Sequence, residues 1–143
     1  MGRVMLDPNW KPLHPISAAR SDTTVTLKFH NPSGTNLVLD TTSVTNMTDG
    51  MFGFRWIDSA QSATVTNVSV TGTDTVVLTL SNVPTGSDPH VGIADANDGT
   101  VLNDAGQIVF QDKRSNLRDS NTDVDILNAP MWNWAAHFQI NVS

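Results

Sequence analysis

Residues 64–80 read TVTNVSVTGTDTVVLTL, and this stretch decides the fold class. Apolar side chains occupy alternate positions on both sides of a central turn, namely Val68 and Val70 before it and Val76, Leu78 and Leu80 after it. Period-two alternation is typical of a strand with one buried face, and the turn residues Thr71 to Asp74 between two such runs predict a β-hairpin. Val65 is out of phase, which predicts a bulge or a frayed start of the first strand.

Further short segments along the chain carry strand signals, and turn residues separate them. These segments are residues 23–29, 37–39, 52–56, 90–94, 107–110 and 137–142. Within 52–56 the side chains of Phe52, Phe54 and Trp56 alternate with small or charged residues, so we expect them to form a core face. No segment of any length has helical periodicity. The sequence therefore predicts an all-β, immunoglobulin-like antiparallel β-sandwich of about seven strands.

Prolines divide the first part of the chain from the rest. Pro8, Pro12 and Pro15 fall within the first fifteen residues, and proline removes a backbone donor and restricts the residue before it. We therefore expect residues 1–20 to be an extended lead-in or linker without regular structure. Residues 21–143 are expected to form a single β-sandwich domain, because a chain of this size suits one core.

Composition excludes several classes of partner. The 143 residues carry a formal net charge of −6, and all 14 acidic residues are aspartates. An acidic chain lacks the clustered Lys and Arg that phosphate-backbone binding needs, so we expect no nucleic-acid partner. No apolar run approaches the roughly 18 to 20 residues of a membrane-spanning helix, so no membrane association is expected. The chain has no cysteine, which rules out a disulfide scaffold and thiolate metal sites.

Two sets of motifs resemble known families. Residues 25–29 and 68–80, VTLKF and VSVTGTDTVVLTL, resemble the bacterial immunoglobulin-like repeats of large surface and secreted proteins. Four other motifs resemble β-domains of bacteriophage tail and tailspike-type proteins: WKPLHP at 10–15, LVLDT at 37–41, NLRDS at 116–120 and NW at 133–134.

The second resemblance implies an accessory domain of a host-surface-recognising protein whose polypeptide carries an esterase or depolymerase domain upstream. It implies a location on the virion tail or the cell surface, and a homotrimer. It transfers no catalytic residue to this chain.

The segment near the C-terminus predicts a carbohydrate site. Aromatic rings can stack on the apolar faces of sugars while polar side chains bind the hydroxyls, and Trp132 and Trp134 share parity if the segment is extended. The candidate carbohydrate-binding residues are Trp132, Trp134, Arg114, Asn116, Arg118 and Asp119. Two alternatives stay open: one or both tryptophans close the end of the core, Trp134 more so, and Arg118 and Asp119 form structural pairs with nearby backbone.

Calcium is the one ligand ion that the sequence suggests, and no other cofactor is indicated. Asp95, Asn97 and Asp98 place oxygen ligands close together before Gly99, although the spacing departs from an EF-hand loop. An Asx-rich turn is the alternative for this segment. The same alternative applies to a second acidic group, Asp119, Asp123 and Asp125.

Catalytic groupings are weak in this sequence. There is no Gly-Asp-Ser block, Asp88-Pro89-His90 suits a turn better than an acid–base relay, and Asp119-Ser120 with His137 is only a conceivable grouping. We therefore expect a non-enzymatic chain. The predicted function is a carbohydrate-binding accessory module of a larger phage or bacterial surface-acting protein, with a glycan or host-surface polysaccharide as partner. The alternative is a structural module for trimerisation or domain spacing.

Overall fold

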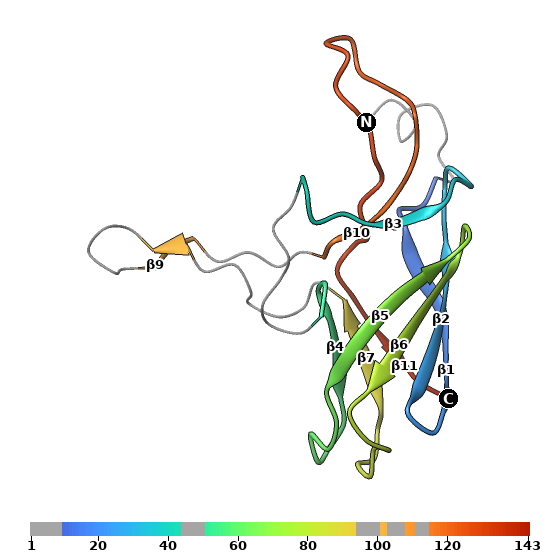
Figure 1. Ribbon diagram of the computed structural model, residues 1–143, viewed down its shortest axis with the longest axis vertical. Helices are drawn as coiled ribbons and strands as arrows, with labels where there is room; N and C mark the ends of the chain where they lie inside the picture. The colour runs from blue at the N-terminus through green and yellow to red at the C-terminus, as the bar shows by residue number, and fades with distance from the viewer. Residues whose placement is uncertain (1–9, 44–50, 94–100, 103–107, 111–114) are drawn as a thin grey trace.

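The computed structural model of the chain describes residues 10–43, 51–93, 101–102, 108–110 and 115–143 (Figure 1). These residues form antiparallel strands, and none of them belongs to a helix long and apolar enough to cross a membrane. The strands are β1 (His14–Ser21), β2 (Thr24–His30), β3 (Leu37–Leu39), β4 (Phe54–Ile57), β5 (Val65–Thr71), β6 (Thr75–Leu80), β7 (His90–Ile93), β8 (Val101–Leu102), β9 (Ile108–Phe110), β10 (Leu117–Asp119) and β11 (Phe138–Asn141).

The first sheet has the order β1-β2-β6-β5 and contains the predicted hairpin. Strands β5 and β6 pair from Thr71 opposite Thr75 to Val65 opposite Leu80. Gly72 in the connecting turn has a φ of +64°, a left-handed conformation that glycine adopts without steric cost. The pairing register shifts between Val65 and Asn67, which confirms the predicted bulge.

The second sheet has the order β11-β7-β4 and packs against the first (Figure 1). One continuous core lies between them, because the alternating apolar residues of both sheets point inward: Val25, Leu27 and Phe29 of β2, Phe54 and Trp56 of β4, Val68 of β5, Val76, Leu78 and Leu80 of β6, and Val91 and Ile93 of β7. The described residues thus form an antiparallel β-sandwich, as predicted. Phe52 packs only at the edge of this core, because its φ of +55° takes it out of the strand.

Two small sheets lie outside the sandwich. Strand β3 pairs with β10, and β8 pairs with β9. Strands β3 and β9 were predicted from their apolar runs, whereas β8 has only two residues and β10, Leu-Arg-Asp, has no apolar run. The β3–β10 pair stands at one end of the sandwich (Figure 1) and carries Arg118 and Asp119 of the predicted site.

The start of the chain differs from the prediction. Residues 1–20 were expected to be an irregular lead-in, but residues 14–20 belong to β1, which pairs with β2 along its length. Pro15 is tolerated because β1 is the outermost strand of its sheet and the register shifts between Pro15 and Ser17. Leu13, just before β1, is fully buried in the core. The lead-in therefore does not extend to residue 20.

The end of the chain completes the sandwich. Strand β11 pairs with β7, which confirms the strand predicted within residues 137–142. Ser143 then reaches the other sheet, because its backbone N–H donates to Ala18 O at 3.0 Å and its carbonyl accepts from Arg20 N at 3.0 Å. These bonds connect the two sheets along the β1 side.

Candidate functional site

Strand β10 sets the direction of the side chains at the predicted site. Successive residues of a strand point to opposite faces, so Leu117 and Asp119 are both fully buried while Arg118 between them is only partly buried. The pairing places Arg118 opposite Val38 of β3. On the other side, Trp134 forms a bridge with Arg118. Two distant parts of the sequence therefore converge on one arginine.

Arg118 is held by three contacts. Its Nε donates to Asp40 Oδ2 at 2.6 Å, and its Nη1 donates to the carbonyl of Asp119 at 2.7 Å. Its guanidinium carbon lies 3.8 Å from the centroid of the Trp132 ring, which is a cation–π contact. Asp40 and Asp119 thus fix the plane of the guanidinium, and the guanidinium covers one face of the Trp132 ring.

Asp40, the partner of Arg118, is a buried carboxylate that backbone hydrogen bonds hold in place. The backbone N–H groups of Ser43 and Thr42 each donate to its Oδ1 at 2.8 Å. These donors, with the Ser43 bond first and the Arg118 bond next, hold the pKa of Asp40 well below its usual range despite burial. Asp40 therefore stays ionised and neutralises Arg118.

Two of the predicted sugar ligands are structural instead. Asp119 is fully buried and accepts from the backbone N–H of Asn133 at 2.9 Å, from Asn133 Nδ2 at 2.5 Å and from Asn121 N at 3.3 Å. Asn116 is also fully buried, and its Nδ2 donates to the carbonyl of Asp40 at 2.9 Å. Both side chains are buried and join β10 to neighbouring segments. The structural alternative holds for Asp119.

The two tryptophans lie together and are both partly exposed. Their ring centroids are 6.2 Å apart with an interplanar angle of 76°, an edge-to-face arrangement. Trp134 is partly exposed and does not belong to the buried core cluster, which speaks against the alternative that it closes the end of the core. The backbone beside it is bonded to β10, since Ala135 N donates to Leu117 O at 2.9 Å.

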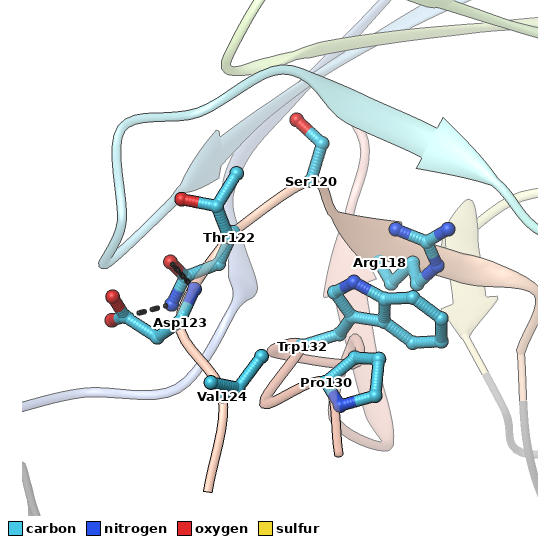
Figure 2. Close-up of a pocket in the computed structure, with 8 residues that line it drawn as sticks. Arg118, Ser120, Thr122, Asp123, Val124, Pro130 and Trp132 are labelled. Carbon is cyan, nitrogen blue, oxygen red and sulfur yellow. Dashed lines mark hydrogen bonds between the residues drawn. The ribbon is translucent and has the colours of Figure 1, made fainter. Parts of the chain in front are cut away.

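A cavity of about 420 Å³ opens beside Trp132 and Arg118 (Figure 2). Its polar lining comes from the segment that follows β10, and Asn121 and Asp123 are bonded to each other there, with Asn121 Nδ2 donating to Asp123 Oδ2 at 3.1 Å. Val124 and Pro130 add apolar surface. The lining residues are Arg118, Ser120, Asn121, Thr122, Asp123, Val124, Pro130 and Trp132.

The proposed calcium ligands Asp95, Asn97 and Asp98 lie outside the described residues, as does Arg114 of the carbohydrate set. In the part of the chain that the structure describes, no three acidic, histidine or cysteine residues gather to hold a metal ion. The second acidic group is spread out. Asp119 bonds to Asn133, whereas the Asp125 carboxylate accepts from the backbone N–H groups of Leu127 and Ala129 at 2.8 and 2.9 Å. Asp125 is thus the Asx-type turn residue of the alternative reading.

Asp88 and His90 do not have the geometry of an acid–base relay. Asp88 has a φ of +57° in a turn, and the nearest approach of its carboxylate to His90 Nε2 is 3.9 Å. His90 Nδ1 instead contacts the backbone carbonyl of Asp88 at 2.7 Å. In the other grouping, Asp119 is occupied by Asn133 and Asn121.

Sequence reasoning missed several lining residues and the counter-ion. Ser120, Asn121 and Thr122 have no distinctive pattern, since polar residues in a loop are common. Asp40 gives a local turn signal, but nothing near it in the sequence points to Arg118, which is 78 residues away. Only the pairing of β3 with β10 brings the two together.

No protein-family model, curated protein or solved structure matches this chain.

Proposed function

We propose that the chain is a non-catalytic carbohydrate-binding module that works as an accessory part of a larger phage or bacterial surface-acting protein. The observation that carries this proposal is the cavity of about 420 Å³ in which the partly exposed Trp132 ring lies beside polar side chains. Sugars present an apolar C–H face and a rim of hydroxyls, and a ring beside short polar groups is complementary to both.

The contacts of Arg118 and the hydroxyl groups in the cavity lining both support a sugar ligand. Arg118 is engaged by Asp40 and by the Asp119 carbonyl, so it orients the Trp132 ring and covers one face of it. A ligand would therefore meet the rest of the ring. The hydroxyls of Ser120 and Thr122 can donate or accept, as sugar hydroxyls do.

The accessory role rests on the resemblance to phage tail and tailspike-type β-domains. One of the motifs that carry it, residues 116–120, includes β10 and ends at Ser120 in the lining of the cavity. In such a module the upstream part of the polypeptide would perform the chemistry and this domain would hold the polysaccharide.

The test is a glycan-array screen followed by calorimetric titration of the sugars that bind. Trp132→Ala is expected to weaken binding at least about tenfold, because it removes the stacking ring, whereas Trp132→Phe keeps a ring and should retain most of the affinity. No binding to any glycan at millimolar concentration would overturn the proposal. Unchanged glycan affinity of Trp132→Ala would show that the glycan binds elsewhere on the protein.

A further inference from the structure

The charges in the lining of the cavity beside Trp132 restrict which sugars it can hold. Two of the lining residues are charged, Arg118 and Asp123. The Asp123 carboxylate accepts from Asn121 Nδ2 at 3.1 Å, so this residue brings an acceptor and no positive charge. Among the lining residues that the structure describes, a cation for a ligand could therefore come only from Arg118.

The positive charge of Arg118 is already used within the protein. Its Nε donates to Asp40 Oδ2 at 2.6 Å, and its Nη1 donates to the carbonyl of Asp119 at 2.7 Å. Asp40 is buried and ionised, so its negative charge lies beside the guanidinium and offsets it. A second anion brought to Arg118 would meet the repulsion of Asp40. Arg118 is thus a poor partner for an acidic ligand.

The wall formed by the segment after β10 supplies no other cation. Residues 119–143 contain no lysine and no arginine. Backbone contacts hold this wall in shape, because Met131 N donates to Asp123 O at 2.9 Å and Val124 forms a bridge with Pro130. A ligand in the cavity therefore meets hydroxyl, amide and carboxylate groups from this segment.

Such a lining treats neutral and acidic sugars differently. A ligand carboxylate would lose part of its hydration in the cavity without gaining a counter-ion, and burying an unpaired charge costs far more than burying a hydroxyl that finds a partner. The net charge of −6 on the whole chain adds a long-range repulsion. Sugar hydroxyls, in contrast, can pair with the hydroxyls of Ser120 and Thr122, and the Trp132 ring requires no charge on the ligand.

We propose that the cavity beside Trp132 selects uncharged saccharides and rejects those that carry carboxylate, sulfate or phosphate groups. This inference rests on the proposed glycan-binding function and adds the charge class of the ligand to it. The observation that carries it is the pairing of Arg118 with Asp40 in a lining that has no second cation among the described residues.

The test compares saccharides that differ only in charge. Oligomers of glucose, galactose and mannose are titrated calorimetrically beside the corresponding glucuronate, galacturonate and mannuronate oligomers, in which a C6 carboxylate replaces the hydroxymethyl group. We expect the neutral member of a pair that binds to have at least about tenfold higher affinity. This ratio should shrink when the salt concentration rises from about 20 mM to about 500 mM, because salt screens the repulsion.

The outcomes separate this inference from the proposed function. An acidic oligomer that binds as tightly as its neutral partner, or more tightly, would overturn the inference and leave glycan binding standing. If no saccharide of either kind binds, the proposed function fails, and the inference fails with it.

A second measurement adds a cation to the cavity. Thr122→Lys places a positive charge on an exposed lining residue and leaves Arg118 and Asp40 in place, so we expect the neutral-to-acidic affinity ratio to fall at least about fivefold. Thr24→Lys is the matched control. Thr24 is exposed at the start of β2, beside the β1–β2 turn, which lies at the opposite end of the sandwich from the β3–β10 pair (Figure 1).

Both variants change the net charge of the chain equally, so they separate the lining from the long-range field. The ratio for Thr24→Lys should stay close to that of the parent. An unchanged ratio in Thr122→Lys, or the same shift in both variants, would overturn the proposal.

Discussion

Arg118 and Asp40 form an ion pair whose Nε–Oδ2 distance is 2.6 Å, although 78 residues separate them in the sequence. The Asp40 side chain is almost completely buried and that of Arg118 is 14% exposed. The pair ties β10 to the turn after β3, and through the ring contact of Arg118 it also fixes Trp132. The shape of the candidate sugar site thus depends on one charge contact between distant segments.

Removing the charge of Asp40 should destabilise the protein. Asp40→Asn takes a partner from Arg118 and weakens the turn at Thr42 and Ser43, so we expect the free energy of unfolding to fall by roughly 2 kcal/mol. Urea denaturation monitored by tryptophan fluorescence would measure this. Asp74→Asn is the matched control, because Asp74 pairs with Lys28 on the surface and its loss should matter little. Equal effects of the two substitutions would contradict the expectation.

Stability should fall in acid partly through Asp58. Its carboxylate accepts from Ser62 Oγ at 2.5 Å, from Trp56 Nε1 at 3.0 Å and from two backbone N–H groups. These bonds, Ser62 first, hold the pKa of Asp58 well below its usual value of 3.8. A carboxyl that binds its proton more weakly when folded stabilises the protein above the unfolded-state pKa, and that contribution is lost as the pH falls below it.

We therefore expect the urea midpoint of the parent to decrease more steeply than that of Asp58→Asn as the pH falls from about 5 to about 2. Parallel curves for the two proteins would show that Asp58 titrates alike in the folded and unfolded states.

Gly86 is a position where a single methyl group should be costly. A Cβ there would lie 2.7 Å from Asp58 Oδ1 and 2.8 Å from the backbone nitrogen of Ala60. Asp58 is held by its own hydrogen bonds and cannot move away freely, so Gly86→Ala should destabilise the protein by about 1–3 kcal/mol. Thermal denaturation would measure the loss.

Gly34→Ala provides the comparison for Gly86→Ala. Gly34 has a φ of +66° but nothing within 4 Å of an added Cβ, so its substitution should cost only backbone strain of about 1 kcal/mol. A smaller loss of stability in Gly86→Ala than in Gly34→Ala would contradict the tight packing around Asp58.

Thr122 tests the polar side of the proposed sugar site. Its side chain lines the cavity, and Thr122→Ala should weaken binding of a bound glycan about fivefold, the effect of losing one hydrogen bond of about 1 kcal/mol. Thr71→Ala changes an exposed threonine at the end of β5 and should leave affinity unchanged. Calorimetric titration with both variants would decide whether the glycan binds in the cavity beside Trp132.

Much of the sandwich could be predicted because its signals are local. The alternation of Val76, Leu78 and Leu80 fixes which face of β6 is buried, and the out-of-phase Val65 marks the bulge in β5. The start of β1 escaped because Pro12 and Pro15 indicate irregular backbone, and only its place at the edge of a sheet makes Pro15 acceptable. Strand β10 was missed because Leu-Arg-Asp, unlike the equally short β3, is not an apolar run.

The sequence predicted which residues lie near the candidate site but not what each of them does there. The sequence by itself determined an all-β chain, its main hairpin, its core faces and the placement of two tryptophans beside a polar loop, because these follow from patterns of neighbouring residues. Only the tertiary structure decided that the Asp119 and Asn116 side chains are buried and hydrogen-bonded to neighbouring segments. It also decided that Arg118 pairs with Asp40, and that the partly exposed Trp132 ring lies beside a cavity. The physical reason is that burial and ion pairing depend on which distant strands lie side by side, and the pairing of β3 with β10 leaves no signal in either short segment.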